Sequence, residues 1–124
     1  MSLFNNLQST MQLLSRKVML NWQAKVVEKA IRELPESKRR EAAELALAGL
    51  DSQHACSNGE VAQRAFERVR SKLQPVRVRG LATWVAAVYH ETRNSGDEGL
   101  AAVHREVLGL IAQLKESLPT RAVA

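Results

Sequence analysis

The chain has 124 residues, of which 45% are apolar and 25% are charged, and its formal net charge at pH 7 is +5. This balance is typical of one globular domain and excludes a disordered chain, and a domain of this length needs neither a disulfide nor a structural metal. No uncharged apolar run approaches the roughly 18 to 20 residues of a membrane-spanning helix. The single cysteine, Cys56, cannot form an internal disulfide, which favours a cytoplasmic location.

Apolar residues recur at helical spacing along most of the chain, and strand-like alternation is nearly absent. The sequence therefore predicts an all-α fold, a five-helix bundle. Residues 1–118 are expected to form this single domain, with 119–124 as a mobile C-terminal tail. The predicted helices span about 3–34, 35–48, 57–73, a segment ending near 93, and 95–118.

The first predicted helix contains no internal Gly or Pro, and Ser2 is a candidate N-cap. About 32 residues at about 1.5 Å each would span about 48 Å, whereas a globule of this size is roughly 35 Å across. The helix therefore either breaks near residues 15–17 and folds back onto its own core, or its first half projects and packs against a partner.

The first half of this helix carries apolar residues at alternating steps of three and four, the spacing of a two-stranded coiled coil. They are Phe4, Leu7, Met11, Leu14 and Val18, and Asn21 is next in register. We therefore treat homodimerisation through these five residues as a hypothesis.

Pro35 ends the first helix and suits the first turn of the second, which is expected to end near Gly49. The stretch 34–45, LPESKRREAAEL, resembles the opening of the last DNA-binding region of bacterial sigma factors, in which a Leu-Pro pair begins a helix of basic and acidic residues. The residues that follow lack the turn and the recognition helix of such a region, so the resemblance implies no function here.

Two capping boxes, Ser57 with Glu60 and Ser95 with Glu98, predict the starts of the third and fifth helices. The alternating segment 76–80 is either an extended connector or the first turn of the fourth helix. That fourth helix should be central, because its broad apolar stripe indicates nearly complete burial. The stripe contains Leu81, Ala82, Trp84, Val85, Ala86, Val88 and Tyr89.

Basic residues are concentrated in the segment 64–93, which has seven basic and two acidic side chains. The candidate contact residues are Arg64, Arg68, Arg70, Lys72, Arg77 and Arg79. They could neutralise the phosphates of a nucleic acid or pair with the carboxylates of an acidic protein partner. The alternative is a solvated face with local pairs such as Glu60 with Arg64. The fourth helix is too apolar to serve as a recognition helix, so any nucleic-acid contact would be non-specific.

We find no nucleophile beside a base, no phosphate-binding glycine loop and no paired catalytic carboxylates, so a non-enzymatic protein without a cofactor is expected. Four residues could supply zinc ligands but lack the usual paired spacings, so no metal site is predicted. They are His54, Cys56, His90 and His104. The GxxG of residues 96–99 has acids at its centre, which would repel phosphate, so we assign it to helix capping.

Together these patterns predict a small cytoplasmic interaction protein, an adaptor or regulator, that self-associates through its first helix and does not bind a membrane. A protein that contacts nucleic-acid phosphates through the arginine-rich region is the alternative.

Overall fold

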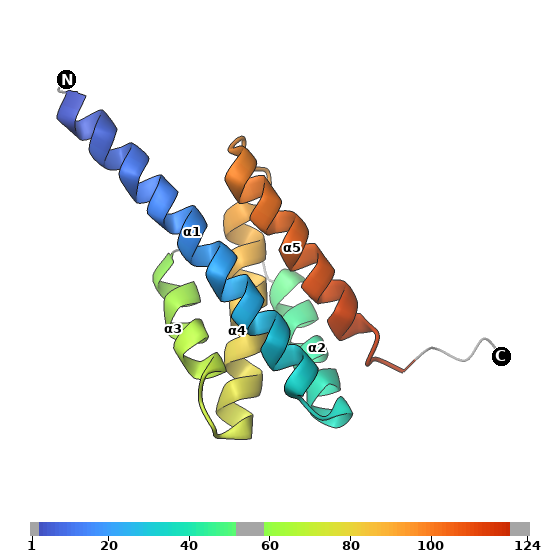
Figure 1. Ribbon diagram of the computed structural model, residues 1–124. Coiled ribbons are helices and arrows are strands. Elements are labelled where there is room, and N and C mark those ends of the chain that lie inside the picture. The colour runs from blue at the N-terminus through green and yellow to red at the C-terminus, as the bar shows by residue number, and fades with distance from the viewer. Residues whose placement is uncertain (1–2, 52–58, 120–124) are drawn as a thin grey trace.

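The computed structural model describes residues 3–51 and 59–119, and within the first helix it describes the side chains of residue 7 and of residues 10 onward. These residues form five α-helices and no strands (Figure 1), which confirms the predicted all-α class. The helices are α1 (Leu3–Glu33), α2 (Glu36–Asp51), α3 (Gly59–Val69), α4 (Gln74–Thr92) and α5 (Glu98–Lys115).

Helix α4 is the centre of the fold and contacts each of the four other helices, as its apolar stripe predicts. Its side chains Leu81, Trp84, Val85 and Val88 are inaccessible to solvent. The alternating segment 76–80 belongs to this helix, so the alternative of an extended connector is wrong. Pro75 lies in the first turn of α4, where its fixed φ favours a helix and its missing N–H costs nothing.

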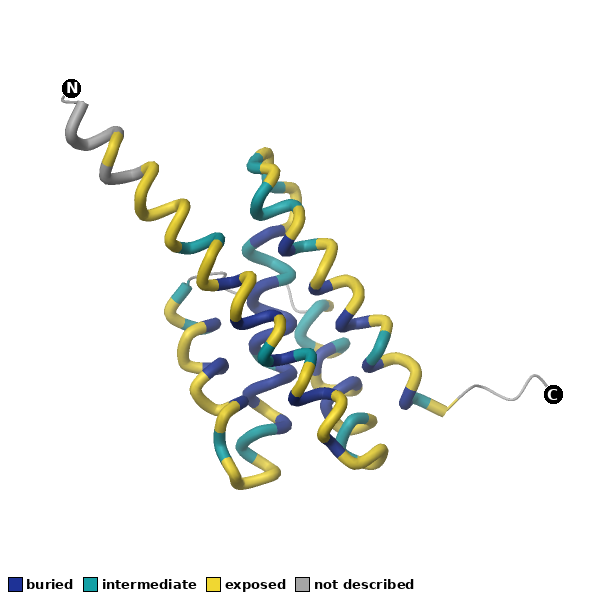
Figure 2. The backbone as a smooth tube through the Cα atoms, in the orientation of Figure 1, coloured by how far each residue is buried: buried dark blue, intermediate teal, exposed yellow. Residues whose placement is uncertain are grey.

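Helix α1 is one uninterrupted helix, without a break at residues 15–17. Its second half lies across α4, with α3 on one side and α5 on the other, whereas its first half extends beyond the other helices (Figure 1). Burial follows the same division, because the described part of the first half is almost entirely exposed (Figure 2). The buried positions of the second half recur at helical spacing. They are Leu20, Gln23, Ala24, Val27, Ala30 and Ile31.

The helix ends explain where the boundaries differ from those expected. Helix α3 ends at Val69 rather than near residue 73, because Leu73 is the extended N-cap of α4 and the chain must turn before it. Helix α5 begins at Glu98, and its cap is Asp97 rather than Ser95. The Asp97 carboxylate accepts a hydrogen bond from the Leu100 amide, which confirms the capping role of the segment 96–99.

The Ser57 capping box, the Ser2 cap and residues 120–124 of the expected tail lie outside the described residues.

Gly80 permits a close approach between α3 and α4. A Cβ atom at Gly80 would lie 2.5 Å from Cβ of Arg68 and 2.8 Å from the carbonyl oxygen of Ala65. Any larger residue would therefore meet the backbone of α3. This contact fixes the spacing of the two helices that carry four of the six candidate basic residues.

Candidate functional site

The projecting half of α1 presents a row of exposed apolar side chains. The side chains of Leu7, Met11, Leu14 and Val18 are 59%, 66%, 58% and 62% exposed. We call these four residues the outer face. Phe4, the fifth residue of the predicted seam, has a side chain outside the described part. Monomeric proteins rarely expose several adjacent large apolar side chains on one helix, and such patches commonly mark interaction sites.

The outer face points away from the rest of the molecule. At about 100° per residue, its four positions fall within about 60° of one another on the helix circumference. The buried positions Leu20, Gln23 and Val27 centre about 180° from them. A partner could therefore cover the outer face without displacing any packed helix.

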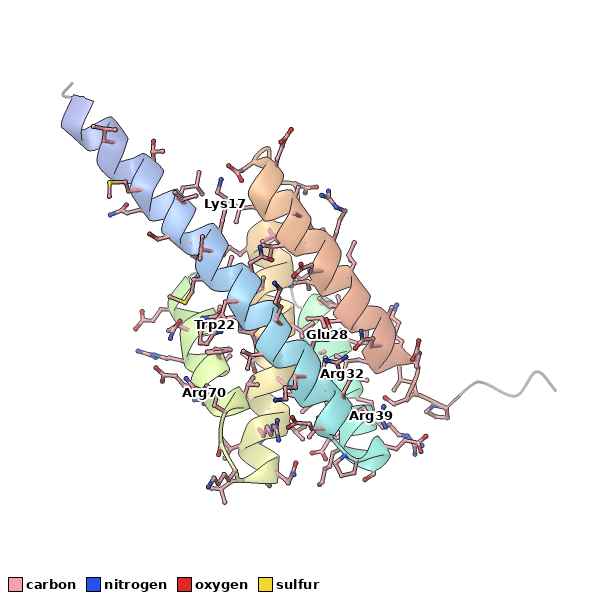
Figure 3. All side chains as sticks on the ribbon, viewed as in Figure 1. Lys17, Trp22, Glu28, Arg32, Arg39 and Arg70 are labelled. Atoms are coloured by element: carbon pink, nitrogen blue, oxygen red, sulfur yellow. The ribbon has the colours of Figure 1, made fainter. Side chains whose placement is uncertain are left out.

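Two ion pairs join the middle of α1 to the junction of α4 and α5. Arg16 contacts Glu91 with both ends of its guanidinium, Nη2 to Oε1 at 2.7 Å and Nε to Oε2 at 3.1 Å. One residue later, Lys17 Nζ lies 3.2 Å from Asp97 Oδ2 (Figure 3 labels Lys17). A bidentate arginine pair restricts orientation as well as distance. The first half of α1 therefore starts from a fixed point on the body of the protein.

Asp97 combines the ion pair with its role as a helix cap. The Leu100 amide that donates to its carboxylate lowers the pKa of Asp97 below the ordinary value, and the Lys17 ammonium lowers it further. Both partners favour the charged carboxylate, so the same group holds the start of α5 and the middle of α1.

Below these ion pairs, a buried amide connects three helices. Gln23 is inaccessible to solvent, and its Oε1 accepts a hydrogen bond from Nε1 of Trp84 at 2.8 Å. Its Nε2 donates to Oε1 of Gln63 at 2.9 Å. The side chain thereby satisfies the indole of α4 and reaches α3 from α1.

An open hollow flanks the outer face. It has a volume of about 490 Å³ and is lined by Leu14, Ser15, Val18, Met19 and Trp22. The Trp22 ring, labelled in Figure 3, packs at 60° against Phe66 of α3 with the ring centroids 5.1 Å apart. Trp22 and Met19 thus extend the apolar surface from the outer face toward α3. The predicted seam contains neither residue. Trp22 lies four residues after Val18, a spacing that could have indicated this extension, whereas Met19 gives no such signal.

The six predicted basic residues divide into two groups. Arg64 pairs with Glu60 at 2.7 Å along α3, and the partly buried Arg77 pairs with Glu33 at 3.0 Å, at the end of α1. The other four are exposed and form no ion pair within the described ranges. We call them the basic surface, and they are Arg68, Arg70, Lys72 and Arg79. Arg70, labelled in Figure 3, lies just past the end of α3.

Two of the four residues considered as zinc ligands, His90 and His104, form hydrogen bonds within the protein. His90 Nε2 lies 3.1 Å from the Gly49 carbonyl oxygen, and His104 Nδ1 lies 3.0 Å from Thr92 Oγ1. Since the Thr92 hydroxyl donates to the Val88 carbonyl, the His104 nitrogen is the donor to Thr92. His54 and Cys56 lie outside the described residues. Within the described ranges, no three His, Cys, Asp or Glu side chains are grouped to hold a metal ion.

No family model, no curated protein and no solved structure matches this chain. Within residues 3–51 and 59–119, none of the helices has the length and apolar character required to cross a membrane.

Proposed function

We propose that this chain is a non-enzymatic interaction protein, an adaptor or regulator of the cytoplasm, whose five helices act as one bundle and which self-associates through α1. The observation that carries the proposal is the outer face, four large apolar side chains on a helix that projects from the other four. Covering them removes apolar surface from water, the main favourable contribution to association.

Two features of α1 support this proposal. The helix is continuous, and the pairs of Arg16 with Glu91 and Lys17 with Asp97 attach its middle to the body. A projecting segment that is already helical and anchored loses less conformational freedom on binding than a segment that must fold. The outer face is therefore prepared for a partner before that partner arrives.

The proposal is tested by replacing Leu7 and Leu14 with aspartate in one variant. The two carboxylates would have to be desolvated in an apolar interface, so we expect dissociation. Sedimentation equilibrium of the unmodified chain should give about twice the monomer mass of 13.8 kDa, and the variant should give the monomer mass.

The matched control carries Leu45→Asp and Leu108→Asp, the same change at two exposed leucines of α2 and α5. It should retain the mass of the unmodified chain. A monomeric unmodified chain at all concentrations, or equal dissociation of both variants, would contradict self-association through α1.

A second candidate function is favoured by the basic surface, because these four exposed cations form no ion pair within the described ranges. We propose as the alternative that Arg68, Arg70, Lys72 and Arg79 contact the phosphates of a nucleic acid. Such contacts release counterions, so the affinity should fall steeply as the salt concentration rises.

The variant Arg68→Glu with Arg79→Glu tests this alternative. Fluorescence anisotropy with a labelled generic DNA duplex at two salt concentrations should show salt-sensitive binding by the unmodified chain and its loss in the variant. Lys29→Glu with Arg32→Glu, an equal change of charge on exposed positions of α1, is the control and should bind far better. Absence of binding by the unmodified chain at low salt eliminates this function.

A further inference from the structure

We propose that the outer face is covered by the outer face of a second copy running antiparallel to it, with Leu7 facing the partner's Val18 and Met11 facing the partner's Leu14. This inference rests on the proposed self-association and specifies its geometry. Three features of α1 lead to it: the spacing of the outer face, the charges that follow it, and the hollow beside it.

The spacing of the outer face reads the same in both directions. From Leu7 the next apolar positions follow after four, three and four residues, at Met11, Leu14 and Val18. When two copies of the helix pair antiparallel and are centred on the middle of this run, every outer-face residue faces an outer-face residue of the partner. In the heptad, Met11 and Val18 occupy a positions and Leu7 and Leu14 occupy d positions. Each a position then packs against a d position of the partner, which is the pairing that antiparallel helices require. None of the four meets a polar position.

The charges beyond Val18 distinguish the two orientations. Continuing the same seam, the positions seven and fourteen residues after Val18 are Lys25 and Arg32, and both are exposed. In a parallel pair each cation would face its own copy at a core position, and like charges brought together there are destabilising.

In the antiparallel pair neither cation faces its own copy. Val18 faces the partner's Leu7, so Lys25 lies seven residues beyond the last facing pair of the outer face, and Arg32 lies a further seven residues along. The two copies of each cation are then at opposite ends of the paired segment, and the repulsion of the parallel arrangement is avoided.

The hollow lies where the partner's first half would pass. In the antiparallel register the segment from Leu14 to Val18 faces the partner's segment from Met11 to Leu7. The hollow beside Leu14 and Val18, bounded by Met19 and Trp22, is therefore adjacent to apolar side chains of the second copy. Long side chains can enter it from that direction, which would bury Met19 and Trp22 more completely.

Disulfide cross-linking between two single-cysteine variants tests the orientation. In a Cys56→Ser background, chains carrying Leu7→Cys and chains carrying Val18→Cys are mixed in equal amounts and equilibrated in a glutathione redox buffer. Disulfides require Cα atoms closer than about 7 Å, whereas two copies of residue 7 in the antiparallel register are offset by about 16 Å along the axis. We expect the mixed disulfide in excess over either homodisulfide by on the order of tenfold. Mass spectrometry of the unreduced products separates the three species.

Each other outcome overturns the proposal in a recognisable way. An excess of both homodisulfides would indicate a parallel pair, leaving self-association through α1 intact. A dimeric chain that forms no cross-link above the level of the matched control, Leu108→Cys, would place the interface elsewhere. A monomeric mass in sedimentation equilibrium would contradict the proposed self-association itself. Binding of that monomer to anionic phospholipid vesicles would then indicate that the outer face contacts a membrane surface.

Discussion

At the scale of single residues, Gln23 shows how this core accepts a polar group. An amide buried without partners is costly, but here the carbonyl oxygen accepts from Trp84 and the amide nitrogen donates to Gln63. The indole of Trp84 in turn needs an acceptor in the middle of the core. Gln23 is therefore a polar connection between α1, α3 and α4 at the level where α1 begins to be buried.

Replacing Gln23 with leucine keeps the approximate volume but removes the acceptor for Trp84. A buried N–H left without a partner costs about 1 to 3 kcal/mol, so we expect the free energy of unfolding in urea to fall by that amount. Gln63→Leu is the comparison, since it removes the partner of Gln23 Nε2 but leaves the acceptor of Trp84 in place. Equal effects of the two variants would show that the Trp84 hydrogen bond has no special importance.

At the scale of elements, two glycines in helices have opposite roles. Gly80 of α4 lies against the backbone of α3, whereas no atom lies within 4 Å of the position that a Cβ would occupy at Gly109 of α5. The first glycine is required by helix packing, and the second costs helix stability without a close neighbour among the described residues.

Alanine at the two positions should therefore change stability in opposite directions. Gly80→Ala should destabilise the protein by about 1 to 3 kcal/mol, as overpacking does in a close-packed interior. Gly109→Ala should stabilise it by about 0.5 to 1 kcal/mol through helix propensity. Urea unfolding of both variants measures the difference, and a tolerated Gly80→Ala would mean that α3 and α4 can separate without cost.

The sequence predicts the elements better than their contacts. Helical periodicity predicts five helices and the central place of α4, because both follow from local spacing. The capping-box pattern predicts Ser95 as the cap of α5, whereas the structure uses Asp97, whose carboxylate also pairs with Lys17. The bidentate pair of Arg16 with Glu91 joins residues 75 positions apart, and no local pattern contains that information.

At the scale of the whole molecule, the structure separates two candidate surfaces that the sequence suggests independently. The spacing of Leu7, Met11, Leu14 and Val18 indicates an apolar seam, but only the fold shows that α1 turns this seam away from the body. The sequence predicts the basic residues as one group, whereas in the structure Arg77 pairs with Glu33 and the exposed cations lie on α3, the following turn and α4. Contacts between residues far apart in sequence determine both the direction in which the apolar seam points and which cations stay exposed.

The contrast between the two tryptophans gives the unmodified chain an intrinsic optical reporter. Trp84 is shielded from water and hydrogen-bonded to Gln23, so its emission should be insensitive to association. Trp22 is half exposed beside the hollow and would lose water contact if a second copy covered α1. The chain has no other tryptophan. A shift of the tryptophan emission to shorter wavelength with increasing protein concentration would therefore report that a second copy covers α1, without any added label.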